Sequence, residues 1–170
     1  MKLNDILLIS MIFIDLYLCY YIFEGCLSNN SIDSLSSLVK KVSMEFLLRY
    51  VLILNFLSFI YELNIKHSYF LCLLFMSFIN ICVLGTLLFR YDIFPTEHYI
   101  FAILLFLSIL LYMIFSARLY NYKLVYIQII LSIYSIYKIQ DSTSNSDIYI
   151  IEIMLLLNFA LFYLIRHIYS

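Results

Sequence analysis

Six apolar segments, separated by short polar stretches, make up most of this 170-residue chain. They cover residues 6–23, 46–61, 69–89, 99–117, 124–137 and 148–165. Each approaches the roughly 20 residues that a helix needs to cross the hydrocarbon core of a bilayer. Because 65% of the residues are hydrophobic and 12% are charged, too few polar side chains remain to cover a water-soluble globule. The sequence therefore predicts an all-α, polytopic membrane bundle of about six transmembrane helices, forming one domain over residues 1–170.

The segment at 124–137 leaves the number of spans open. It is short and carries Gln128 and several serines, so a bundle of five transmembrane helices stays an alternative to six. With six spans, both termini lie on the same face of the membrane. The 10 Lys and Arg residues then divide equally between the two faces, so the positive-inside rule leaves the orientation undecided.

The connecting segments carry their own predictions. Residues 28–43 place aliphatic side chains at helical spacing beside two lysines, which predicts an amphipathic helix at the membrane interface, with a disordered connector as the alternative. The short link at 62–68 predicts that the second and third helices are antiparallel neighbours. Pro95 is expected at the start of the next helix, because a proline in the first turn removes no helical hydrogen bond. Residues 138–147, rich in Ser, Thr, Asn and Asp, predict a surface loop.

Charge and motif content exclude several classes of function. The formal net charge of −1, from 10 basic and 11 acidic residues, provides no broad field to attract nucleic acid. The 3 histidines lack a second metal ligand at helical spacing, and no serine has the setting of a hydrolase nucleophile. The 4 cysteines show no paired spacing, and three of them lie inside or at the edge of apolar segments, where a thiol is expected to behave as a small hydrophobic residue. We therefore expect no nucleic-acid partner, metal, cofactor or catalytic residue set, and we favour a non-enzymatic role.

Asp15 is the foremost candidate for a functional residue. It lies near the middle of the segment 6–23, where an ionised carboxylate is costly unless it is paired or faces a polar cavity. We expect it to face the bundle interior, with amides supplied by three other segments, Asn55, Asn80 and Asn158. These four residues form a predicted intramembrane polar core. Two interpretations stay open: a protonated, hydrogen-bonded structural Asp15, or a carboxylate that serves in proton relay, ligand binding or partner binding.

Charged residues also mark the ends of the apolar segments. Glu62 ends the second segment and Glu152 lies one turn inside the sixth, and these two are candidate interface residues. Glu152 is alternatively a charge that favours a helix N-terminus. Arg166, at the end of the sixth segment, is expected to extend toward the lipid headgroups. Glu45 and Arg49 are four residues apart and are expected to pair along one helix.

Three local patterns are similar to those of a known family. Paired tyrosines and an acidic residue close the first segment, an aromatic and an acidic residue close the second, and a proline-containing turn precedes an aromatic helix start. The residues are Tyr20, Tyr21 and Glu24, then Tyr61 and Glu62, then Phe94, Pro95 and Tyr99. Across residues 16–117, their order and spacing resemble the Svp/Tex family of small multi-pass sorting receptors. The resemblance implies a non-enzymatic protein that recognises the membrane spans of its cargo and contacts the COPII vesicle coat.

Three hypotheses for function follow. We favour a multi-pass protein of the endoplasmic reticulum or Golgi that sorts or assembles other membrane proteins, with the bilayer, those proteins and a vesicle coat as partners. The first alternative is a hydrophobic subunit of a larger respiratory or ATP-synthase complex in the mitochondrial inner membrane, where chains of such composition are common. The second is a small transporter or lipid-active enzyme that uses Asp15. The chain has 2 glycines and 1 proline, which counts against a broken-helix transport site.

Overall fold

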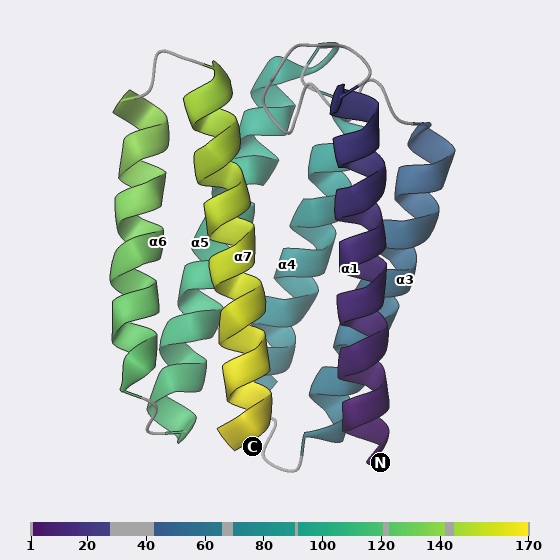
Figure 1. Cartoon of the computed structure of the whole chain (residues 1–170). Helices are drawn as coiled ribbons and strands as arrows, with labels where there is room; N and C mark the ends of the chain where they lie inside the picture. Colours follow the sequence, from purple (N-terminus) through teal and green to yellow (C-terminus); the bar gives the residue numbers. More distant parts are fainter. Residues whose placement is uncertain are drawn as a thin grey trace.

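The chain folds as a bundle of α-helices. The computed structural model describes residues 2–27, 43–65, 70–90, 92–120, 123–141 and 145–169, and within these ranges it contains helices and no strand. The helices are α1 (Leu3–Leu27), α3 (Met44–Asn64), α4 (Phe70–Leu88), α5 (Pro95–Tyr120), α6 (Leu124–Asp141) and α7 (Asn145–Tyr169). They run up and down side by side, and both termini lie at the lower end of the bundle in Figure 1. The all-α prediction is therefore confirmed.

Three of the described helices are long and apolar enough to cross a membrane. They are Met44–Asn64, Phe70–Leu88 and Pro95–Arg118. The predicted number of six spans is thus reached only in part, because the described apolar stretches of α6 and α7 are shorter, at Leu124–Lys138 and Met154–Ile168. The three long apolar helices support an integral membrane protein.

Several local predictions are confirmed. Each of the six apolar segments contains a helix, and α5 begins at Pro95. α3 and α4 pack against each other, as the short link between them predicts. Glu45 and Arg49 form an ion pair along the exposed side of α3. The interfacial helix predicted for 28–43 lies, except for its last residue, outside the described residues. α6 and α7 extend into the predicted loop at 138–147 from both sides.

The helices pack in a connected series. α1 packs on α3, α3 on α4 and α4 on α5, while α6 and α7 pack on each other and on α5. α4 and α5 make the most extensive contact. Gly85 allows this approach because the ring of Phe101 on α5 occupies the space that a Cβ atom at this position would need.

The main hydrophobic core occupies the half of the bundle that carries the termini. It includes Leu8 and Met11 in the first half of α1, and Met76, Met113 and Phe162 on the other helices. A second, smaller cluster joins α3 and α4 at the opposite end and consists of Leu47, Val51 and Leu87. Among the residues whose burial is described, the larger cluster therefore lies at the end where the chain begins and ends.

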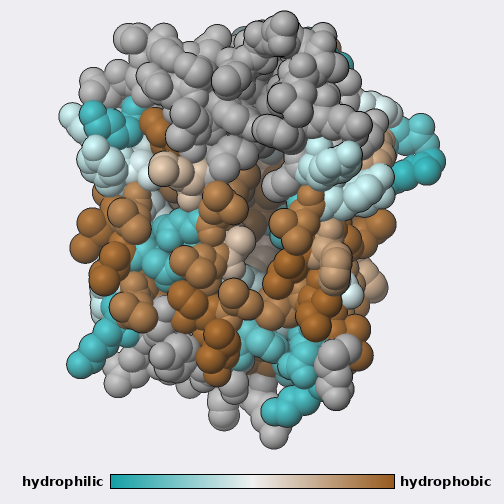
Figure 2. All heavy atoms as spheres, in the orientation of Figure 1, coloured by the Kyte–Doolittle hydropathy of each residue, from teal (hydrophilic) through white to brown (hydrophobic). Residues whose placement is uncertain are grey.

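The outer surface is apolar over the middle of the helices. Figure 2 shows hydrophobic residues in continuous columns on the visible face, with hydrophilic residues mainly toward the two ends. Large exposed apolar side chains occur on every helix and include Phe13, Phe56, Phe78, Ile103, Ile130 and Leu157. Soluble monomers rarely expose such contiguous apolar surfaces. The outer surface is suited to contact with lipid or with other membrane helices.

Candidate functional site

A buried ion pair joins α3 to α7 at the end that carries the termini. Glu62 is 0% exposed and Arg166 is 3% exposed. The guanidinium of Arg166 donates two parallel hydrogen bonds to the carboxylate, from Nη1 to Oε2 at 2.7 Å and from Nη2 to Oε1 at 2.6 Å. This bidentate arrangement is the strongest form of the pair. The prediction that Arg166 extends toward the headgroups is wrong, because Glu62 provides its counter-charge inside the bundle.

Tyr112 of α5 completes this cluster. Its hydroxyl donates a hydrogen bond to Glu62 Oε2 at 2.9 Å and also contacts Arg166 Nη1. The Arg166 guanidinium lies over the Tyr112 ring, 5.1 Å from its centre, at a distance typical of a cation–π contact. The three side chains come from three helices and lie within the hydrophobic core. They fix how α3, α5 and α7 meet.

A second, more exposed set of contacts attaches α1 to the same end. His167 Nδ1 lies 2.8 Å from the Tyr61 hydroxyl, and His167 Nε2 lies 3.3 Å from Asp5 Oδ1. Asp5 also accepts a hydrogen bond from the backbone N–H of Lys2 at 2.7 Å. This hydrogen bond, with a smaller contribution from His167, lowers the pKa of the Asp5 carboxyl below its ordinary value. The first turn of α1 is thereby linked to the last turn of α7.

The predicted intramembrane amides form separate pairs. Asn55 of α3 donates to the carbonyl of Asn80 at 3.1 Å, and Asn80 of α4 donates to the carbonyl of Asn55 at 3.2 Å. Ser58 adds a hydrogen bond to Asn80 Oδ1 at 3.4 Å. These reciprocal contacts satisfy both amides within the α3–α4 interface.

Asn158 belongs to a different interface. From α7, its Nδ2 donates to the carbonyl of Gln128 and to the hydroxyl of Ser132, both at 2.8 Å. Both of these partners are on α6. The three predicted amides therefore do not gather at one place: Asn55 and Asn80 lie together between α3 and α4, and Asn158 lies between α6 and α7. None of these hydrogen bonds involves Asp15.

Asp15 lies on the core-facing stripe of α1 and is nevertheless exposed. It follows Leu8 by seven residues and Met11 by four, so the helix places all three side chains on one side. Leu8 and Met11 are buried, whereas Asp15 is exposed. No hydrogen bond or ion pair to its carboxyl forms among the described residues. Asp15 thus follows the last buried residue described on this stripe of α1, while α1 keeps its contact with α3 through Tyr17.

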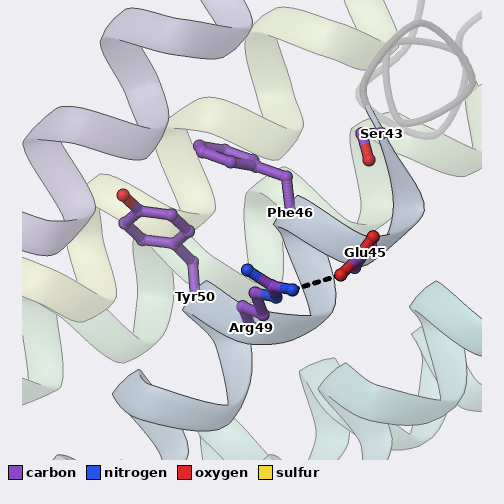
Figure 3. Close-up of a pocket in the computed structure, with 5 residues that line it drawn as sticks. All are labelled: Ser43, Glu45, Phe46, Arg49 and Tyr50. Atoms are coloured by element: carbon purple, nitrogen blue, oxygen red, sulfur yellow. Dashed lines mark hydrogen bonds and ion pairs between the residues drawn. The ribbon is translucent and has the colours of Figure 1, made fainter.

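An open hollow lies farther along the α1–α3 pair, toward the end opposite the termini. It is lined by Ser43, Glu45, Phe46, Arg49 and Tyr50 (Figure 3). Phe46 and Tyr50 point toward α1, where their rings lie 6.3 and 5.5 Å from the ring of Tyr17. Arg49 is occupied by Glu45. The hollow is therefore lined by aromatic side chains that join α3 to α1 and by an exposed ion pair.

Two other predictions concern acidic residues. Glu152 is half-buried in the first third of α7, and Glu62, a candidate interface residue, is buried by the contacts of the ion pair. Among the residues that the structure describes, no group of three or more His, Cys, Asp or Glu is placed to hold a metal ion.

Comparisons with protein-family models, with curated proteins and with solved structures find no match to this chain. The fold and its polar contacts together define an all-helical bundle with candidate membrane spans, closed at one end by a buried ion pair and carrying one exposed carboxyl in the middle of α1.

Proposed function

We propose that this chain is a six-span membrane protein with a non-enzymatic role, which sorts or assembles other membrane proteins by binding their helices within the bilayer. The exposed carboxyl of Asp15 carries the proposal. A charged or strongly polar side chain at the middle of a membrane is costly when it faces lipid, and such residues usually contact a partner or a polar cavity. The described residues offer Asp15 no partner, and a second protein would supply one.

Helix length supports six crossings. α1 and α7 have 25 residues each, which at 1.5 Å per residue give a length of about 37 Å. α6 has 18 residues and reaches about 27 Å. A hydrocarbon core of about 30 Å is within reach of all three when the last turns and flanking side chains extend into the interface. Both termini lie at one end of the bundle, as an even number of crossings requires (Figure 1).

The early secretory pathway is the proposed location. The Svp/Tex resemblance, with its paired tyrosines and its Tyr61–Glu62 pattern, supports the endoplasmic reticulum or Golgi and a vesicle coat as partner. Residence in the mitochondrial inner membrane together with a respiratory or ATP-synthase complex would overturn this part of the proposal. Fractionation of native cells with a tagged full-length chain decides between the two.

Site-specific crosslinking tests the binding role. A photo-crosslinking residue replaces Ile12, which is exposed and lies three residues before Asp15. The matched control places the same residue at Ile103, which is exposed on α5. We expect defined adducts with membrane proteins from position 12, their loss in the Asp15→Asn variant, and none from position 103. Equal adducts from both positions, or adducts that persist without the Asp15 carboxyl, would contradict the proposal.

A further inference from the structure

We infer that the site at Asp15 receives a transmembrane helix that carries a Lys or Arg side chain near the middle of the bilayer. This inference rests on the proposed function and specifies the chemistry of the partner. It depends on where Asp15 points, on what the chain itself can offer it, and on the charge that would complement it.

The direction of Asp15 follows from the register of α1. Tyr17 stacks on Tyr50 of α3, with ring centres 5.5 Å apart, so the Tyr17 side of α1 faces α3. Residues two apart on an α-helix point about 200° apart, so Asp15 faces away from this contact. It continues the stripe of Leu8 and Met11, which contact the core. A partner at Asp15 therefore does not compete with the contact between Tyr17 and Tyr50.

The chain's own polar groups at similar depth are engaged elsewhere. Asn55 and Asn80 bind each other's carbonyls, and Asn158 binds α6. None of these amides contacts Asp15. A partner that satisfies the carboxyl therefore comes from outside the described part of this chain.

The described helices of a second copy do not supply the complementary charge at the depth of Asp15. The exposed cations of the described helices lie near helix ends, with Arg49 in the second turn of α3 and Arg118 in the last turn of α5. The half-buried Lys138 lies in the last turn of α6. Asp15 lies halfway along α1. Two copies packed on their α1 helices would place two carboxyls together, which is unfavourable. A helix of another protein with a central Lys or Arg provides the opposite charge at the required depth.

The surroundings of Asp15 suit a helix rather than a small ion. Ile12 and Leu16 flank it and are exposed, at 38% and 61%. These aliphatic side chains would pack against the apolar residues of an incoming helix while the carboxylate accepts hydrogen bonds from its ammonium or guanidinium group. In a low-dielectric environment such a charge-assisted contact is stronger than in water.

Binding of designed peptides to the full-length chain in lipid vesicles tests this inference. The probes are leucine-rich transmembrane peptides that differ at one central position, which is Lys, Gln, Glu or Leu. Energy transfer between a labelled peptide and the labelled protein measures binding. For the wild-type chain we expect the Lys peptide to bind at least about tenfold more tightly than the Leu peptide, a difference that corresponds to one ordinary hydrogen-bonded charge contact.

Two variants place the effect at Asp15. Asp15→Asn should abolish the preference for Lys, and Asp15→Lys should transfer it to the Glu peptide. Glu45→Gln, which removes an exposed acidic group on α3, is the matched control and should bind like the wild type. If a variant fails to fold, the comparison of the Lys and Leu peptides on the wild-type chain still tests the inference. Equal binding of the Lys, Gln and Leu peptides overturns the inference, as does a Lys preference that survives in Asp15→Asn.

The two proposals fail separately. If crosslinking from position 12 depends on Asp15 while the Lys peptide is not preferred, the binding role stands and the basic partner is refuted. If adducts from position 12 are also absent, both proposals fall.

Discussion

Breaking the Glu62–Arg166 pair should destabilise the protein far more than breaking any exposed ion pair. Glu62 is 0% exposed and Arg166 is 3% exposed, so neither charge can turn to water when its partner is removed. Glu62→Gln removes the counter-charge of the guanidinium and leaves one amide oxygen in place of the two carboxylate oxygens that it contacts at 2.7 and 2.6 Å. The expected loss is the roughly 3–5 kcal/mol that breaking a buried pair costs.

The double variant Glu62→Gln/Arg166→Met tests whether the two side chains stabilise the protein as a pair. Arg166→Met alone removes the counter-charge of the buried Glu62 carboxylate, to which Tyr112 still donates a hydrogen bond at 2.9 Å. When both charges are absent, no uncompensated charge remains in the core. The double variant should therefore be less destabilised than the sum of the two single variants by at least about 2 kcal/mol.

Reversible unfolding in mixed micelles measures these differences. The chain has 17 tyrosines and no tryptophan, so tyrosine fluorescence and circular dichroism report the transition. The control is Glu45→Gln, which breaks the exposed Glu45–Arg49 pair and should change the unfolding free energy by no more than about 0.5 kcal/mol. A Glu62→Gln variant as stable as this control, or strictly additive single substitutions, would refute the reasoning.

Three further substitutions test other contacts. Asn80→Leu removes side-chain bonds across the α3–α4 interface and should lower the unfolding free energy by about 0.6–1.7 kcal/mol in the same assay. Gly85→Ala places a methyl group in the Phe101 ring and should cost about 1–3 kcal/mol; the added substitution Phe101→Leu should recover part of this loss, and no recovery would mean that α4 and α5 are not in such close contact. Because the folded-state pKa of Asp5 is lowered, its contribution to stability is present above the ordinary value of 3.8 and is lost as the pH falls through the folded-state value. Denaturation curves between pH 2 and 5 should therefore show a smaller acid-dependent loss for Asp5→Asn than for the wild type, and identical curves would contradict this.

The helices were predictable because hydrophobicity alone specifies them. A backbone in lipid must satisfy its hydrogen bonds internally, so a long apolar segment has few alternatives to a helix. Local signals placed the ends well: α5 begins at Pro95, and Glu45 pairs with Arg49 four residues later. The number of spans was harder to predict, because the segment at 124–137 is short and carries Gln128 and several serines.

The buried ion pair was missed because each partner was interpreted alone. Arg166 near a helix end suggested extension toward the headgroups, and Glu62 suggested an interface residue. A signal was available in the order of the segments: the C-terminal ends of the second and sixth helices of an up-and-down bundle lie on the same face. Glu62 and Arg166 occupy those two ends and carry opposite charges. Considering charges by face, rather than by segment, would have paired them.

The polar core was predicted to be one site and is several, since amides are satisfied by what is nearest to them. Asn55 and Asn80 occupy adjacent helices joined by a short link, and Asn158 faces α6 across another short link. Each amide also finds a backbone carbonyl there, an acceptor that a sequence pattern does not reveal. Nothing in these contacts requires the Asp15 carboxyl.

The distribution of polar contacts explains how α1 can both belong to the bundle and offer a binding surface. Its first turn is held to α7 through Asp5 and His167, and Leu8 and Met11 fix the following turns in the core. Beyond Met11 the described contacts of α1 are with α3, through the aromatic ring of Tyr17. A helix fixed in this way cannot rotate to hide Asp15 without breaking its contacts at the end that carries the termini. The closed end therefore presents the carboxyl in a preorganised position, which reduces the entropy lost when a partner helix binds.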